Sequence, residues 1–154
     1  MVPGSEVERL TEQDGRPAVE TRFRVRYHET DAMGIVHHAS YVMWFEEGRS
    51  AYTRVLGLPY AQMAAEGILL AVTEIAARYH RPARYDDEII VRTWLDKIHS
   101  RGMSFSYVVQ HAASGQSLVT GRTSHISVDP SGHVVRLPER MRAWYDHRQQ
   151  TPHA

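Results

Sequence analysis

Apolar and basic residues alternate along residues 21–28, where the sequence reads T-R-F-R-V-R-Y-H. Phe23, Val25 and Tyr27 occupy every second position of this stretch. A period of two is typical of a β-strand that buries one face, so we predict a half-buried strand here. The preceding residues 1–19 are polar and acidic, and we expect them to form a flexible leader.

After residue 40 the apolar or small residues recur every three or four positions, which is typical of one face of an amphipathic helix. The residues on this face are Tyr41, Trp44, Phe45, Gly48, Ala51, Tyr52 and Val55. Ser40 is the expected N-cap, because its hydroxyl can accept a hydrogen bond from a free backbone amide. Gly48 costs about 1 kcal/mol of helix propensity relative to alanine, which indicates close approach to a neighbouring backbone. Gly57 and Pro59 end the helix.

Most of the remaining chain is predicted to be strand. After a short helix over residues 60–66, strand-forming residues dominate the stretches 68–81, 88–98, 103–111 and 118–128. The connectors are rich in Gly, Pro, Asp and Ser and are too short for parallel crossovers, so we predict antiparallel hairpins. A brief strand over 133–137 and a C-terminal helix from Pro138 to about His147 complete the prediction.

The order of these elements indicates an α+β fold, in which one long helix packs on a curved antiparallel sheet of about five to six strands. The chain has 154 residues, which is most simply one domain. We place this domain at residues 20–148 and expect a flexible tail at 149–154.

Composition removes several classes of function. Lys+Arg and Asp+Glu are 18 each, so no excess of positive charge points to nucleic acid or an anionic membrane as a partner. Cysteine is absent, which excludes disulfides, thiolate nucleophiles and cysteine-ligated zinc and is compatible with the cytoplasm. No apolar run approaches the roughly 20 residues of a membrane helix. We therefore expect a cytoplasmic protein without membrane insertion.

Several common catalytic motifs are absent. The sequence contains no G-x-S-x-G, no phosphate-binding P-loop and no G-x-G-x-x-G. Its 10 histidines are scattered without an H-E-x-x-H pair, and the adjacent His37 and His38 are poorly placed to share one ion. We therefore expect neither a metal nor a cofactor.

Asp31 is the main catalytic candidate, in a stretch without periodicity that precedes the long helix. It lies too far from Ser40 to cap that helix. Gly34 lets the backbone turn tightly, and the helix N-terminus beyond it offers free amides and the positive end of the helix dipole. Such a site suits acyl transfer, in which the carboxylate attacks a carbonyl or activates a water molecule. An Asx-turn or a solvated side chain is the alternative role for an aspartate here.

The run Y-H-E-T-D-A-M-G-I-V-H-H-A-S-Y at residues 27–41 closely resembles the signature of hotdog-fold acyl-CoA thioesterases. It is similar to the 4-hydroxybenzoyl-CoA thioesterase family and its YbgC-like members, whose pattern is approximately D-x-D/T-x-x-G-x-V-x-H/Y-x-x-Y. The resemblance includes the P-A-R-Y-D-D-E turn at 82–88 and covers roughly residues 20–145. It implies a hotdog fold and hydrolysis of a short-chain or aromatic acyl-CoA thioester to free acid and CoA.

The same resemblance implies a role for each matching residue. Asp31 takes the position of the catalytic carboxylate, as nucleophile or general base, and Gly34 is the motif glycine. His38 stands at the helix entrance, where its backbone amide polarises the thioester carbonyl and its imidazole orients substrate or water. His37 is expected to line the substrate pocket. Tyr41 matches the helix aromatic, whose role in the core is as plausible as a contact with substrate.

Glu29 lies where some members of the family carry another acid, and we expect its side chain to be solvated. The resemblance further implies a dimer, often paired into a homotetramer. Each active site would lie between one subunit's aspartate loop and the other subunit's helix and strands. The CoA nucleotide is expected on the surface, held by basic residues. The candidates are Arg78, Arg81, Arg84, Lys97 and Arg101.

Two other functions stay open, because one fold hosts many activities. A hotdog-fold hydratase or dehydratase is disfavoured, since the residues after Asp31 lack the Asn-Pro of the D-x-N-P-[IL]-H motif. A non-catalytic acyl-binding protein has no need of a desolvated carboxylate. The choices between CoA and acyl-carrier-protein thioesters, and between a covalent anhydride and general-base catalysis, are also open.

Overall fold

The computed structural model describes residues 7–145. Its one sheet has six strands in the order β1-β2-β4-β5-β6-β3, and each neighbouring pair is antiparallel. The strands are β1 (Val7–Gln13), β2 (Arg16–Arg24), β3 (Leu69–Tyr79), β4 (Glu88–His99), β5 (Gly102–His111) and β6 (Ser117–Val128). The helices are α1 (Ser40–Val55), α2 (Tyr60–Ala65) and α3 (Glu139–Tyr145), with a 3-10 turn η1 at Tyr27–Glu29.

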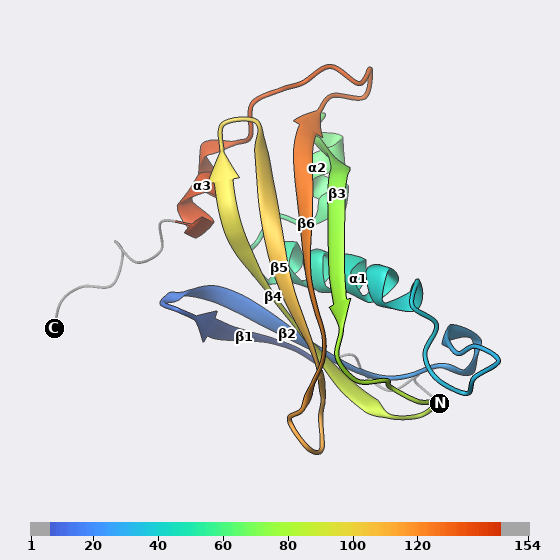
Figure 1. Ribbon diagram of the computed structural model, residues 1–154. Coiled ribbons are helices and arrows are strands. Elements are labelled where there is room, and N and C mark those ends of the chain that lie inside the picture. The colour runs from blue at the N-terminus through green and yellow to red at the C-terminus, as the bar shows by residue number, and fades with distance from the viewer. Residues whose placement is uncertain (1–6, 146–154) are drawn as a thin grey trace, which may run out of the picture.

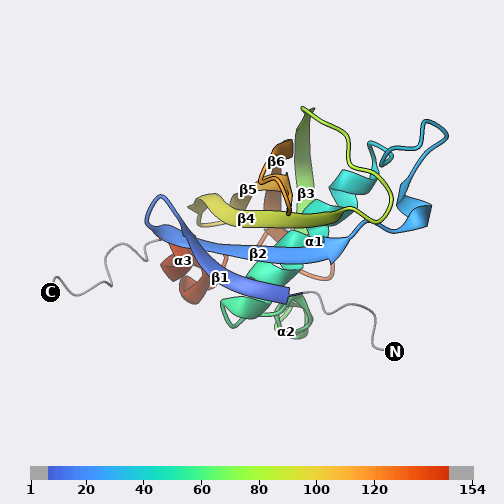
Figure 2. The same ribbon diagram turned by 90° about the horizontal axis from the view of Figure 1, so that it is seen from below.

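The long helix α1 lies across the inner face of the curved sheet and contacts β1, β2, β4 and β5 (Figures 1 and 2). Trp44, Phe45 and Tyr52 are buried between the helix and the sheet. The prediction of a long helix packed on a curved antiparallel sheet, an α+β fold, is confirmed.

Glycine makes the close approach of α1 to the sheet possible. A β-carbon added at Gly48 would collide with the Thr93 hydroxyl and lie 3.1 Å from a methyl group of Val91. The predicted close approach is therefore correct, but the neighbours are β4 side chains and not a backbone. Gly121 of β6 has the same effect, because a β-carbon there would collide with the ring of Phe45.

The predicted N-terminal leader is wrong for the part that the structure describes. Residues 7–13 form β1, which pairs with β2 from Gln13↔Arg16 to Val7↔Arg22. Asp14 and Gly15 both have positive φ, 51° and 77°, as an Asp-Gly hairpin turn requires. The second strand therefore spans 16–24 and not 21–28, and residues 27–29 turn instead of extending it. Residues 1–6 lie outside the described residues.

The later elements match the prediction closely, apart from the brief strand at 133–137. That segment makes one isolated bridge, Val128↔Val134, because the Asp129 carboxylate accepts the amides of Ser131 and His133 and closes a turn. The C-terminal helix is confirmed at Glu139–Tyr145. Its predicted end at residue 147 and the predicted tail at 149–154 lie outside the described residues.

The two edges of the sheet differ in character. The β1 edge carries charged residues, and Glu8 and Arg9 form ion pairs with Arg54 and Glu20. The β3 edge is the longer one, and almost all of its 11 residues are exposed. Its exposed apolar side chains are Leu69, Val72, Ile75 and Tyr79. An edge strand with so many exposed apolar side chains is an unusual feature of a monomer, since natural proteins protect such edges.

Candidate active site

Residues 30–39 form a tight loop between η1 and α1, with Asp31 near its start. The Asp31 amide donates to the Ile35 carbonyl at 2.8 Å, and the Gly34 amide donates to the Asp31 carbonyl at 3.0 Å. Gly34 has a φ of 75°, which a residue with a side chain adopts only with strain. The predicted turn at Gly34 is therefore present.

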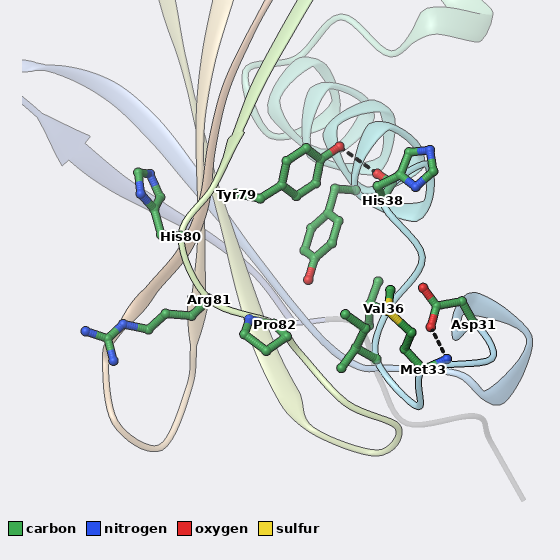
Figure 3. Close-up of a pocket in the computed structure, with 10 residues that line it drawn as sticks. Asp31, Met33, Val36, His38, Tyr79, His80, Arg81 and Pro82 are labelled. Atoms are coloured by element: carbon green, nitrogen blue, oxygen red, sulfur yellow. Dashed lines mark hydrogen bonds between the residues drawn. The ribbon is translucent and has the colours of Figure 1, made fainter.

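The Asp31 side chain has two distinguishable oxygens. Its Oδ1 accepts the Met33 amide at 2.8 Å, which is an Asx-turn bond that holds the carboxylate in place (Figure 3). Within residues 7–145 no hydrogen bond reaches Oδ2. One oxygen thus fixes the orientation of the side chain and the other stays available to a ligand or water.

Glu29 holds the Asp31 loop in place. The expectation that its side chain is solvated is wrong. Its side chain is buried, with Oε1 accepting the Arg26 amide at 2.8 Å and Oε2 accepting the Trp44 indole N–H at 2.5 Å. Its backbone carbonyl accepts both the His37 amide at 2.8 Å and the Ser40 hydroxyl at 2.9 Å. One residue therefore connects the start of the Asp31 loop to the first two turns of α1.

His37 makes the capping contact that we predicted for Ser40. Ser40 is not the N-cap, because its hydroxyl donates to the Glu29 carbonyl. The N-cap position is Ala39, and the Nδ1 atom of His37 accepts the Ala39 amide at 3.0 Å. His37 is not among the residues that line the cavity beside Asp31, so the structure gives it the capping contact and not the predicted place in the pocket wall.

A cavity of about 320 Å³ lies between this loop and the end of β3. Its walls come from two segments far apart in the sequence, the loop before α1 and the residues that follow β3 (Figure 3). The lining residues are Asp31, Met33, Ile35, Val36, His38, Tyr41, Tyr79, His80, Arg81 and Pro82. Most of these side chains are apolar or aromatic around a few polar groups, which is typical of a small-molecule site.

The backbone of His38 is held in place while its amide stays free. Its carbonyl accepts the Tyr79 hydroxyl at 2.8 Å (Figure 3). No described residue accepts a hydrogen bond from the His38 N–H. This amide lies at the start of α1, where the helix dipole adds positive potential. A free amide in this position is suited to stabilising negative charge on an oxygen.

Tyr41 is a core residue that also lines the cavity. It is buried under the cavity floor, and its hydroxyl accepts the Ala83 amide at 3.2 Å. Burial raises the pKa of the Tyr41 hydroxyl, so the side chain stays neutral. Its ring packs edge-on against Tyr79, 5.5 Å between centroids, and both rings line the cavity.

The predicted basic residues do not form one cluster. Arg81 and Arg84 line a second cavity of about 320 Å³ together with His111, and this cavity shares Arg81 and Pro82 with the first. Lys97 lies near the other end of β4, roughly 30 Å along the strand at about 3.3 Å per residue. Arg101 follows it in the β4–β5 turn.

Over residues 7–145, no three histidine or acidic side chains gather closely enough to hold a metal ion. None of the described helices has the length and apolar character that crossing a membrane requires.

The profile of the Thioesterase-like superfamily matches residues 25–145. The chain belongs to this superfamily. The hotdog fold and the enzyme class, a thioester hydrolase, that the sequence predicted are both confirmed.

Named relatives agree with this assignment. YneP of Bacillus subtilis (strain 168), provisionally named an acyl-CoA thioesterase, is 38% identical over 105 residues, which are 68% of this chain and 75% of YneP. YbgC of Escherichia coli O157:H7, an acyl-CoA thioester hydrolase, is 32% identical over 89 residues, 58% of this chain and 66% of YbgC. The crystal structure of DHNA-CoA thioesterase from Staphylococcus aureus superposes with a TM-score of 0.77 at 29% identity, covering 86% of this chain and 89% of that protein.

The Glu29→Gln variant tests whether the buried carboxylate holds the loop. The amide places an N–H group where one of the two bonded oxygens lies, so we expect the free energy of unfolding to fall by about 1–3 kcal/mol. We also expect thioester hydrolysis to slow by at least about tenfold, since small displacements of a reacting group are costly. The control is Glu47→Gln on the exposed face of α1. Equal activity and stability of the two variants would contradict this role of Glu29.

Proposed function

We propose that the chain is a cytoplasmic acyl-CoA thioesterase that hydrolyses a short-chain or aromatic acyl-CoA to the free acid and CoA at the cavity beside Asp31. The observation that carries the proposal is that Asp31 and His38 line the same cavity, while one carboxylate oxygen of Asp31 and the backbone amide of His38 have no partner among the described residues. The names of YneP and YbgC support the same substrate class. The apolar walls formed by Met33, Ile35 and Val36 suit an acyl group.

In the proposed reaction the thioester carbonyl oxygen accepts the His38 N–H, and the α1 dipole stabilises the oxyanion that forms. Asp31 Oδ2 either takes a proton from the attacking water or attacks the carbonyl carbon itself. In both cases the carbon–sulfur bond breaks, and CoA leaves as a thiolate that is then protonated. In the second case water hydrolyses the mixed anhydride. The His38 imidazole orients the water, and no cofactor is needed.

The Asp31→Asn variant tests the carboxylate. We expect the rate of thioester hydrolysis to fall by a factor of about 10²–10⁴, because the amide neither accepts a proton nor attacks. The measurement is the release of free thiol from a panel of acyl-CoA and aroyl-CoA thioesters, with thermal unfolding to confirm that the variant folds.

Each outcome of this assay has a distinct meaning. A variant with full activity contradicts the role of Asp31. A wild-type protein that releases no CoA from any member of the panel contradicts the thioesterase proposal. In that case tight acyl-CoA binding without turnover supports an acyl-binding protein, and hydration of an enoyl-CoA supports a hydratase.

We propose that Arg81 and Arg84 bind phosphate groups of CoA. Their cavity adjoins the one beside Asp31, so a bound CoA could extend from one into the other. The Arg84 backbone is held by the Asp87 carboxylate, which accepts its amide at 2.9 Å, and both guanidinium groups stay exposed. Arginine suits phosphate because its planar group donates two parallel hydrogen bonds.

The double variant Arg81→Ala and Arg84→Ala tests this contact. We expect KM for an acyl-CoA to rise by at least about tenfold, because the variant loses one or two charged hydrogen bonds to the substrate. Hydrolysis of the matching N-acetylcysteamine thioester, which has no phosphate, should not change. Arg101→Ala is the matched control. Equal losses on both thioesters would contradict phosphate binding at this position.

We propose that the chain pairs with a second copy through β3. The edge of β3 opposite β6 has no strand beside it within the described residues. Its apolar side chains Val72 and Ile75 are 48% and 45% exposed, so a second copy would bury this apolar surface as well as pair the backbone. The β1 edge, with its charged side chains, is protected against such pairing.

The Ile75→Lys variant tests this interface. Two lysines would meet near the two-fold axis, so we expect the variant to be a monomer by light scattering and to lose most thioesterase activity. Val134→Lys is the control, because Val134 is 48% exposed and lies outside β3. A wild-type protein that is monomeric at assay concentration contradicts the proposal, and the measured mass separates a dimer from the predicted homotetramer.

A further inference from the structure

Helix α1 carries a buried cation that the proposed reaction does not use. Arg49 is 7% exposed. Its Nε donates to the Tyr60 hydroxyl at 3.3 Å and its Nη1 donates to the Tyr107 hydroxyl at 3.2 Å. The Tyr107 hydroxyl is hydrogen-bonded to the Thr123 hydroxyl at 2.6 Å. The Thr123 hydroxyl is in turn hydrogen-bonded to the imidazole of His125 at 2.7 Å.

The charge of Arg49 has no partner of opposite sign in the described part of the chain. No Asp or Glu oxygen of residues 7–145 lies within 4.0 Å of its guanidinium. Burial acts to lower the pKa of Arg49, but the oxygens of Tyr107 and Tyr60 outweigh it and the net direction is upward, so the group stays charged. Hydroxyl groups solvate a buried charge without neutralising it, and buried charges are normally paired.

Arg49 is accessible from one side, through a cavity of about 250 Å³ between α1, α2 and the start of β3. Tyr60, Leu69 and Leu70 form other parts of its wall. The Tyr60 hydroxyl accepts a hydrogen bond from Arg49, and no described residue accepts a hydrogen bond from the Tyr60 hydroxyl. Arg49 and Tyr60 therefore offer donors to a group that enters this cavity.

The proposed dimer would place this cavity beside the partner's active site. A two-fold axis pairs β3 antiparallel to itself, and full overlap of Leu69–Tyr79 centres the pair on Glu74. Leu69 would then lie opposite the partner's Tyr79. Since Leu69 lines the Arg49 cavity and Tyr79 lines the Asp31 cavity, the two cavities would meet across the interface.

We propose that the distal end of the acyl group reaches from the Asp31 cavity of one subunit into the Arg49 cavity of the other, where Arg49 selects acyl groups that end in a hydrogen-bond-accepting oxygen, charged or neutral. This inference rests on the proposed thioesterase function and on pairing through β3. In this inference Arg49 determines substrate specificity, and Asp31 carries out the chemical step.

Glu46 is the alternative partner for Arg49, because it lies one turn away on α1 and lines the same cavity. Its side chain is exposed and makes no ion pair with Arg49 in the structure. If Glu46 is the functional counter-ion, Glu46→Gln and Arg49→Met should reduce activity equally on all substrates. If Arg49 serves the substrate, Glu46→Gln should retain the substrate preference, and the preference for a carboxylate should increase.

The first test compares wild-type activity on matched thioesters. The pairs are pentanoyl-CoA with 4-carboxybutanoyl-CoA and hexanoyl-CoA with 6-hydroxyhexanoyl-CoA. We expect kcat/KM to be at least about tenfold higher for one or both oxygen-ended members, because a hydrogen bond to a charged group stabilises a complex by about that factor. The two pairs distinguish a charged acceptor from a neutral one. Hydrolysis of both pairs without a preference overturns this inference and leaves the thioesterase proposal intact, whereas no hydrolysis at all overturns the latter.

The second test changes the site. Arg49→Met should remove the preference for the oxygen-ended acyl group, and Arg49→Lys should retain part of it. In both variants, hydrolysis of pentanoyl-CoA should stay within about threefold of wild type. Tyr60→Phe gives an independent measurement if Arg49→Met does not fold, and it should reduce the preference. Arg54→Met, on the exposed side of the same helix, is the control. An equal loss on both members of a pair would indicate a structural role and contradict the proposal.

Mixed dimers test whether Arg49 acts across the interface. Asp31→Asn subunits are paired with Arg49→Met subunits, so that one of the two sites combines a native Asp31 with a native Arg49 from the other subunit. We expect this heterodimer to recover the wild-type preference for the oxygen-ended acyl group. If Arg49 served the Asp31 of its own chain, no site would be intact and the preference would stay lost.

Discussion

The geometry of the proposed active site depends on one buried residue, Glu29. Glu29 accepts the Trp44 indole N–H and the Arg26 amide with its side chain, and the His37 amide and Ser40 hydroxyl with its carbonyl. These four bonds fix the start of α1 relative to the loop that carries Asp31. Without them the carboxylate and the free amide of His38 would be on segments with independent motion. Preorganisation of this kind is what electrostatic catalysis requires.

A second constraint comes from the sheet. Helix α1 packs mainly beneath β1, β2, β4 and β5 and contacts β3 through Tyr41 and Tyr79, which leaves most of β3 uncovered. The residues that complete the cavity, Tyr79 to Pro82, are at the end of this uncovered strand. Pairing of β3 with a second copy would stabilise the same segment that closes the proposed active site. Assembly and catalysis would then depend on one strand.

The sequence predicted the helix, the later strands and the cluster of Asp31, His38 and Tyr41, because period and local motif determine them. It did not predict β1, although the Asp14-Gly15 pair is a hairpin signal, because the alternation on either side is masked by charged residues. The burial of Glu29 could not be read locally, since its partner Trp44 is 15 positions away. The same applies to Arg49, whose contact with Tyr107 spans 58 positions. Long-range side-chain pairs of this kind depend on the packed fold.

In the proposed complex the thioester lies between Asp31 and the amide of His38. A crystal structure of the Asp31→Asn variant with a bound acyl-CoA measures this directly. We expect the thioester carbonyl oxygen at about 3 Å from the His38 nitrogen, with the carbonyl carbon beside the side chain of residue 31. A thioester bound elsewhere, with the His38 amide pointing to solvent, would contradict it.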